Sequence, residues 1–256
     1  MKDKRVLYVS SEVVPYLAEN EVSLMSYDVP KMVNDQGGQI RIFMPRYGNI
    51  NERRHQLHEV IRLSGMNIII NDLDQPLIIK VASLPGERLQ VYFIDNEEYF
   101  KRKQYYFDDE GQPFPDNDER AIFFARGVIE TIKKLNWVPD IIHINGWMAS
   151  FIPIYLKHYY KTDSYFNDTK MVMSVYNEKD AQFENNITEK LEFDNIKDLS
   201  ALENPTFQNF VSESMNLVDI VVKGDEFLED RLEKAFEKAT SKKFDYVSGE
   251  SITEVY

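Results

Sequence analysis

Residues 5–15 read RVLYVSSEVVP, and this stretch decides the fold. Its apolar part, residues 6–9, is uninterrupted, which is typical of a strand that helices bury on both faces of a parallel sheet. Polar residues follow at 10–12 and a proline follows at 15, and no small-residue cleavage site is present. We therefore predict a central strand at 5–10 rather than a secretory signal.

Further runs rich in Val and Ile predict strands at 39–44, 66–70, 77–82, 89–95, 140–144, 170–175 and 218–222. Apolar residues at i, i+3 and i+4 predict a helix over 118–135, and Asp116 with Glu119 resembles a capping box at its start. Further helices are expected over 147–160 and 225–238. This alternation predicts an α/β fold with a doubly wound, mainly parallel sheet.

Two segments depart from the alternation of strands and helices. Segment 66–95 has three strand signals and no helix between them, so we predict a β-meander at the edge of the sheet. Segment 178–205 is polar and lacks clear periodicity, which indicates a long loop or short irregular helices that are mobile.

The composition limits the classes of function. The 256 residues are 43% hydrophobic and include no cysteine, so a sizeable core is expected and thiol or disulfide chemistry is excluded. The formal net charge of −13 makes the chain a poor partner for nucleic acid or an anionic membrane. No stretch approaches the ~20 apolar residues of a membrane span. We expect a soluble cytoplasmic protein without a cofactor.

Four blocks of sequence carry a family resemblance. They are 6–15 (VLYVSSEVVP), 30–48 with its RIFMPRYG end, 91–124 with VYFID and DNDERAIFF, and 139–147 (PDIIHINGW). In this order they resemble the starch synthase catalytic domain of glycosyltransferase family 5, which includes glycogen synthases. The resemblance implies that 1–256 is a single Rossmann-like domain, the N-terminal half of the two-domain GT-B fold, with the second domain absent.

The clearest departure from the family pattern is in the loop after the first strand. Family members have Lys-x-Gly-Gly-Leu there, where the glycines let the backbone approach the donor diphosphate and the lysine adds positive charge. The matching residues here are Ala18, Glu19, Asn20, Glu21 and Val22. Two like charges ~4 Å apart cost about 4 kcal/mol at an effective dielectric constant of 20, so the carboxylates would repel a diphosphate.

Three further runs differ from the family pattern. The family's His-x-His-Asp-Trp is His143-Ile144-Asn145-Gly146-Trp147, its Ile-His-Asn is Val175-Tyr176-Asn177, and its Val-Ser-Pro is Val222-Lys223-Gly224. We predict a ligand cleft with no catalytic residue and no metal site. Its candidate residues are Glu12, Glu19, Asn20, Glu21, His143, Asn145, Trp147, Tyr176 and Asn177.

Several residues allow two interpretations. His55 and His58 have metal-ligand spacing but no evident third ligand, so surface histidines are the preferred interpretation. The acidic group of Glu12, Glu19, Glu21 and Asp28 is interpreted as a solvated loop rather than a cation site. His143 is expected to be a hydrogen-bonded core or cleft histidine rather than a base. The aromatic residues of 99–107 could stack on sugar rings or cover a sheet edge.

Three functions remain open. The first is a non-catalytic relative, a pseudoenzyme that binds or regulates. The second is a glycosyltransferase component whose nucleotide-binding half comes from another chain. The third is an enzyme with new chemistry in an acidic cleft. Because the family's first domain closes on a second one, we expect a homo-oligomer or a partner protein on the uncovered cleft face, with a sugar or glucan as the ligand.

Overall fold

The computed structural model describes residues 1–183, 186–247 and 251–256. A single large sheet runs through the molecule in the strand order β10-β9-β8-β7-β1-β2-β6-β5-β3, with β4 paired to β5. The strands are β1 (Arg5–Ser10), β2 (Gln39–Pro45), β3 (His58–Glu59), β4 (Met66–Ile70), β5 (Leu73–Ser83), β6 (Gln90–Asp95), β7 (Ile141–Asn145), β8 (Lys170–Val175), β9 (Ile220–Lys223) and β10 (Lys242–Phe244). β1 is central and pairs in parallel with both β2 and β7, as predicted.

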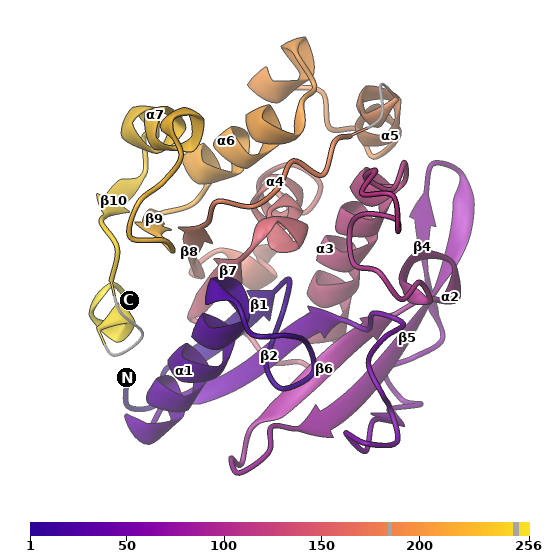
Figure 1. The fold of residues 1–256 in the computed structure, drawn as a ribbon, viewed down its shortest axis with the longest axis vertical. Coiled ribbons are helices and arrows are strands. Elements are labelled where there is room, and N and C mark those ends of the chain that lie inside the picture. The colour runs from indigo at the N-terminus through magenta and orange to yellow at the C-terminus, as the bar shows by residue number, and fades with distance from the viewer. Residues whose placement is uncertain (184–185, 248–250) are drawn as a thin grey trace.

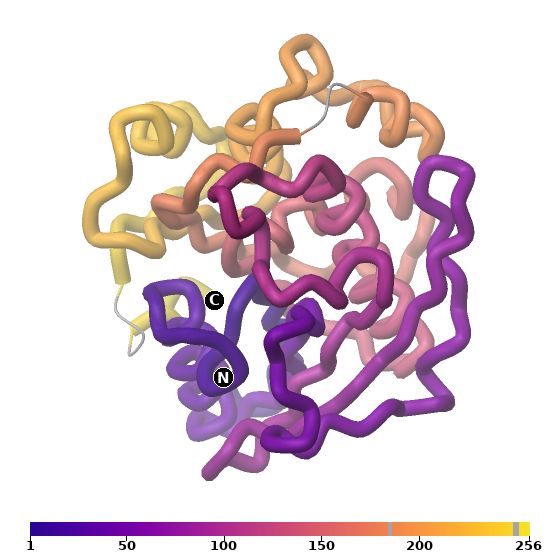
Figure 2. The backbone as a smooth tube through the Cα atoms, turned by 45° about the vertical axis from the view of Figure 1, so that its right-hand side comes forward, coloured from indigo at the N-terminus to yellow at the C-terminus, as the bar shows by residue number. Residues whose placement is uncertain are grey.

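Helices cover both faces of the sheet (Figure 1). On one face, α1 (Glu21–Asp35) packs on β1 and β2, together with the short C-terminal helix η4 (Ile252–Glu254). On the other face, α3 (Asn117–Lys134), α4 (Phe151–Lys157), α6 (Phe207–Leu217) and α7 (Asp230–Lys238) follow one another. The doubly wound α/β architecture is therefore confirmed. Both chain ends lie on the α1 side (Figure 2).

Helix α1 begins where the sequence offers a strong local cap. The Asn20 side chain accepts from the Ser23 backbone N–H at 2.9 Å, and the Ser23 hydroxyl accepts from the Asn20 N–H at 2.9 Å. This reciprocal pair is a capping box. Behind it, Val22, Met25 and Val29 are buried against the sheet. The cap holds the first turn of α1 at the carboxyl end of β1.

Helix α3 begins and ends within one residue of the predicted bounds, but its start is not capped as predicted. Asp116 makes no side-chain cap. Its two carboxylate oxygens accept instead from Arg102 at 2.6 and 2.5 Å. A bidentate arginine is a stronger partner than a backbone N–H. Asp116 therefore fixes the preceding loop, residues 101–116, rather than the helix end.

The β-meander is confirmed. β4 pairs antiparallel with β5, and β5 pairs antiparallel with β6, which joins the parallel part of the sheet at β2. Pro76 lies inside β5 and opposite Asn67. Proline is tolerated here because the strand is near the sheet edge.

Two predicted helices are shorter than expected. Residues 147–160 form the 3₁₀ turn η1 (Trp147–Ala149) and then α4, and α7 begins at Asp230 rather than at 225. For the polar segment 178–205 we expected a long loop or short irregular helices. The structure has two short helices there, α5 (Ile187–Phe193) and η3 (Ser200–Glu203). Residues 184–185 of that segment lie outside the described residues. The remaining short elements are α2 (Glu97–Phe100) and η2 (Ser164–Phe166).

Candidate functional site

A cavity of about 290 Å³ lies at the carboxyl ends of the central strands. In open α/β sheets this edge is where ligands bind. Twelve residues line it: Glu12, Asn20, Glu21, Val22, Tyr106, Phe107, Trp147, Tyr176, Asn177, Glu178, Lys179 and Asp225. They come from the loops after β1, β7, β8 and β9, from the start of α1, and from loop 101–116. We call this cavity the cleft.

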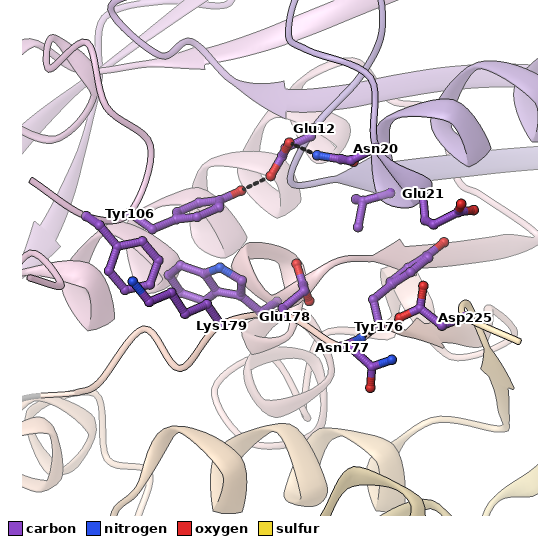
Figure 3. A pocket seen from close by; sticks show the side chains of 12 residues that line it. Glu12, Asn20, Glu21, Tyr106, Tyr176, Asn177, Glu178, Lys179 and Asp225 are labelled. Carbon is purple, nitrogen blue, oxygen red and sulfur yellow. Dashed lines mark hydrogen bonds between the residues drawn. The ribbon is translucent and has the colours of Figure 1, made fainter. Parts of the chain in front are cut away.

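Glu12 is the centre of a hydrogen-bonded network on one wall of the cleft (Figure 3). Its Oε1 accepts from the Tyr106 hydroxyl at 3.0 Å, and its Oε2 accepts from Asn20 Nδ2 at 2.6 Å. Tyr106 in turn accepts from the Tyr47 hydroxyl at 3.2 Å. The network ties loop 101–116 to the loop that follows β1.

Carboxyl groups outnumber cationic groups in the lining of the cleft. The carboxyl groups of Glu12, Glu21, Glu178 and Asp225 line it, against the single ammonium group of Lys179. Burial raises the pKa of Glu178 well above its usual value, and the nearby charge of Glu12 adds to this, against a hydrogen bond from the Trp147 backbone. Burial also raises the pKa of Glu12, although Asn20 and Tyr106 oppose it.

Aromatic rings form another part of the lining, which includes Tyr106 of this network. The ring centroids of Tyr106 and Trp147 are 5.0 Å apart in an edge-to-face arrangement, and Phe107 lies beside them at the cleft. The indole Nε1 of Trp147 is buried and has no hydrogen-bond partner among the described residues.

Six of the nine predicted cleft residues line the cavity, namely Glu12, Asn20, Glu21, Trp147, Tyr176 and Asn177. Glu19, His143 and Asn145 do not line it. Glu19 is exposed in the turn before α1. His143 and Asn145 are completely buried. They share one side of β7, where Asn145, the last residue of the strand, donates to α1.

His143 is a core histidine. Its Nδ1 is 2.6 Å from the Tyr256 hydroxyl and its Nε2 is 2.8 Å from Ser174 Oγ. Burial lowers the pKa of His143 to about 3, so the ring is neutral at physiological pH. Both ring nitrogens are thus engaged in the core, which agrees with the preferred interpretation of this residue.

Asn145 replaces the second histidine of the family run and also has a structural role. Its Nδ2 donates to Ser26 Oγ at 2.9 Å and to the Val22 carbonyl at 3.0 Å. Its Oδ1 accepts from the Tyr176 hydroxyl at 2.6 Å. Asn145 therefore links the first turn of α1 to Tyr176, and acts on the cleft only by holding its walls.

Gly146, which stands where the family has aspartate, has a positive φ of 82°. A Cβ at this position would lie 2.5 Å from Ser11 Oγ and 3.2 Å from Glu178 Oε1. The glycine is thus required by both backbone and neighbours. An aspartate would add a further carboxylate next to Glu178.

Sequence reasoning missed Glu178, Lys179 and Asp225, which line the cleft. A signal was available, because each lies in the loop that follows a predicted parallel strand. Tyr106 and Phe107 belong to the aromatic cluster that allowed two interpretations. The structure divides that cluster, since Tyr99 and Phe100 are buried with Phe123 while Tyr106 and Phe107 face the cleft.

No metal site was predicted, and no group of three or more potential ligands is assembled in the ranges 1–183, 186–247 and 251–256. His55 packs its ring on Tyr16 at 5.0 Å between centroids. Within the same ranges, every helix is too short or too polar to cross a membrane.

The sequence model of the starch synthase catalytic domain matches residues 5–227. This chain belongs to the starch synthase catalytic domain family. The glycogen synthases of Chlorobium limicola and Chlorobium phaeobacteroides are 41% and 40% identical to it over 174 residues, which cover 68% of this chain and 36% of each relative. The matched part therefore spans about a third of those relatives.

The fold of this family member also resembles a solved one. The catalytic domain of starch synthase IV from Arabidopsis thaliana, bound to ADP and acarbose, matches 86% of this chain and 45% of that chain, with a TM-score of 0.69 and 17% identity. The likeness confirms that the α/β fold resembles that of the GT-B starch synthase catalytic domain.

Proposed function

We propose that this chain binds a neutral, hydroxyl-rich ligand of the sugar or glucan class in the cleft and does not itself transfer glucose from a nucleotide sugar. The observation that carries the proposal is the charge of the cleft, with four carboxyl groups against one ammonium group. Carboxylates accept hydrogen bonds from sugar hydroxyls, whereas they repel a diphosphate.

The aromatic wall supports a sugar ligand. Tyr106, Phe107 and Trp147 offer apolar ring faces on which a sugar ring can pack. Glu178 with its raised pKa can donate a proton to a hydrogen bond or accept one. This mixture of donors, acceptors and rings suits a polyol better than an anion.

The start of α1 argues against a bound phosphate. A helix N-terminus normally attracts anions through its free N–H groups and its dipole. Here the Asn20 side chain already accepts from the Ser23 N–H, and the Glu21 carboxylate stands in the first turn. The positive end of this helix is therefore compensated by the chain's own groups.

A tryptophan-fluorescence titration tests the proposal, because the chain has two tryptophans and Trp147 lines the cleft. Maltoheptaose should change the emission saturably, and Trp147→Phe should lose that change. ADP-glucose at the same concentrations should give none. Tighter binding of ADP-glucose than of the oligosaccharide, or no response to any malto-oligosaccharide, would overturn the proposal.

A second candidate function is a glucosyl-transferring component that works with a nucleotide-binding half. It is favoured by the 41% identity to a protein named glycogen synthase. Radiolabelled transfer from ADP-glucose and UDP-glucose to glycogen separates the two candidates. We expect incorporation at the level of a heat-inactivated sample. Incorporation that grows with time and with the amount of protein would favour the second candidate.

Self-association also remains a proposal. Phe227, in the loop after β9, is 78% exposed and its carbonyl accepts from the cleft residue Asn177 at 2.7 Å. A large exposed ring beside the cleft is a plausible contact for a second copy. Light scattering at high concentration should show a dimer that Phe227→Ser weakens. A monomer at every concentration would contradict it.

A further inference from the structure

A second and larger cavity lies between α6 and α7 and extends down to β8. Its volume is about 810 Å³, within the range of small-molecule sites. It shares with the cleft only Trp147 and the loop 176–179. We call this cavity the α6–α7 groove.

One wall of the groove carries a row of positive charges. Arg231, Lys234 and Lys238 line it from α7. Their i, i+3, i+7 spacing puts them on one face of the helix, spread over about 10 Å. None of the three forms an ion pair with any of the described residues. In a chain with a net charge of −13, three such cations in one cavity are an exception.

The floor and the facing wall of the groove are not charged. Met173 and Val175 of β8 form part of the lining together with Val211, Leu232 and Ala235. From α6, Gln208, Ser212 and Asn216 add amide and hydroxyl groups. A ligand in the groove would thus meet an apolar surface below and hydrogen-bonding groups opposite the cations.

The other charged residues that line the groove are Glu178, Lys179 and Asp180 of loop 176–180 and Glu229, which precedes α7. Glu229 lies at the end near loop 176–180, because its N–H donates to Asn177 Oδ1 at 2.7 Å. Asp180 lies there too, and its Oδ1 accepts from the Gln182 N–H at 2.9 Å. Asn216 marks the opposite end, where its Oδ1 accepts from the N–H of Thr240, just beyond α7, at 2.9 Å. The Lys238 end is therefore the positive end.

We propose that the α6–α7 groove is a second ligand site, which takes an amphipathic anion: an aromatic or aliphatic body of roughly 10 Å with a phosphate, sulfonate or carboxylate group. The body lies on the apolar floor and the anionic group faces Lys234 and Lys238. This assignment is independent of the sugar proposal for the cleft, since the cationic wall is no part of that cavity.

A matched pair of fluorescent molecules tests the site. 8-Anilinonaphthalene-1-sulfonate carries the anionic group, and N-phenyl-1-naphthylamine has the same body without it. The sulfonate should bind saturably with one site per chain and at least tenfold more tightly than the neutral amine. Lys234→Ala with Lys238→Ala should remove that preference and leave the affinity for the amine unchanged. Equal affinities for the two molecules in the wild type would overturn the proposal.

Two controls locate the binding. Lys103→Ala with Lys197→Ala removes the same charge from exposed positions outside the groove, and should leave both affinities unchanged. Ala235→Trp from α7 and Ser212→Trp from α6 each fill the groove, and each should abolish binding while circular dichroism shows a folded chain. Undiminished sulfonate binding in either folded tryptophan variant would contradict the site.

Discussion

The ring of Tyr176 lies against Gly224 so closely that a Cβ at position 224 would be 2.3 Å from Tyr176 Cε1. Contacts of this length between a Cβ and a ring are not tolerated in packed interiors. Both residues depart from the family pattern, where histidine and proline stand at the matching positions. The geometry couples the two departures, because tyrosine at 176 requires glycine at 224.

Gly224→Ala should therefore destabilise the chain by about 1–3 kcal/mol through overpacking. Combining it with Tyr176→His should recover part of that loss, because the smaller ring vacates the space. Urea unfolding of the two single variants and the double variant gives the coupling free energy. Strictly additive losses would show that the two positions are independent.

Tyr106→Phe should loosen loop 101–116. The change removes the hydrogen bond to Glu12 and leaves a buried carboxylate with one partner fewer. We expect a loss of about 1–3 kcal/mol in the free energy of unfolding and faster amide exchange in the loop. Tyr105→Phe is the matched control, because that hydroxyl accepts from the exposed Asn49 at 3.0 Å rather than bonding to Glu12. Equal effects of the two changes would contradict the role of Glu12.

The parallel strands of the core were predictable, because near-continuous apolar runs such as residues 6–9 are typical of strands that are buried on both faces. Helix α1 was harder to predict, since Pro30 lies inside it and its cap depends on a pair, Asn20 and Ser23. Helix α6 was missed although Thr206 caps it through the Asn209 N–H at 3.3 Å. Local signals of this kind are weak until tertiary packing selects them.

The cleft was predictable where a residue follows a strand, as with Trp147 and Tyr176. Side chains alternate along β7, so His143 and Asn145 share one side of the strand, where Asn145 donates to α1 and His143 contacts Tyr256, and neither lines the cavity. Glu19 lies in the exposed turn before α1 and does not line the cavity either. The expected partner and the cytoplasmic location stay predictions.

Glu178→Gln should change the pH dependence of stability. Because burial raises the pKa of Glu178 above its unfolded value of about 4.5, ionisation destabilises the native state. As the pH rises from the unfolded-state pKa of Glu178 to its native-state pKa, the unfolding free energy of the wild type should fall relative to that of the variant. The fall should be up to about 1.4 kcal/mol per pH unit. Thermal unfolding from pH 4.5 to pH 8, with exposed Glu189→Gln as control, measures this. Parallel curves for the wild type and Glu178→Gln would contradict it.

His143 should make the native state less stable as the pH falls, whereas Glu178 makes it less stable as the pH rises. Its pKa is about 3 in the native state against 6.5 in the unfolded chain, so the unfolded chain binds the proton first as the pH falls. Below about pH 6.5 the wild type should lose about 1.4 kcal/mol per pH unit relative to His143→Gln. Urea unfolding at pH 7, 6 and 5 tests this, with the exposed His58→Gln as control. A difference that stays constant with pH would rule it out.

The charge of the cleft is the central claim, and calorimetric titration with ADP and with maltoheptaose measures it most directly. The wild type should bind maltoheptaose and give no saturable heat with ADP at millimolar concentrations. Glu21→Lys should gain measurable ADP affinity. Glu19→Lys makes the same change two residues earlier in the sequence and outside the cavity, so it should gain far less. Micromolar binding of ADP by the wild type, or equal gains from the two lysine variants, would contradict the account.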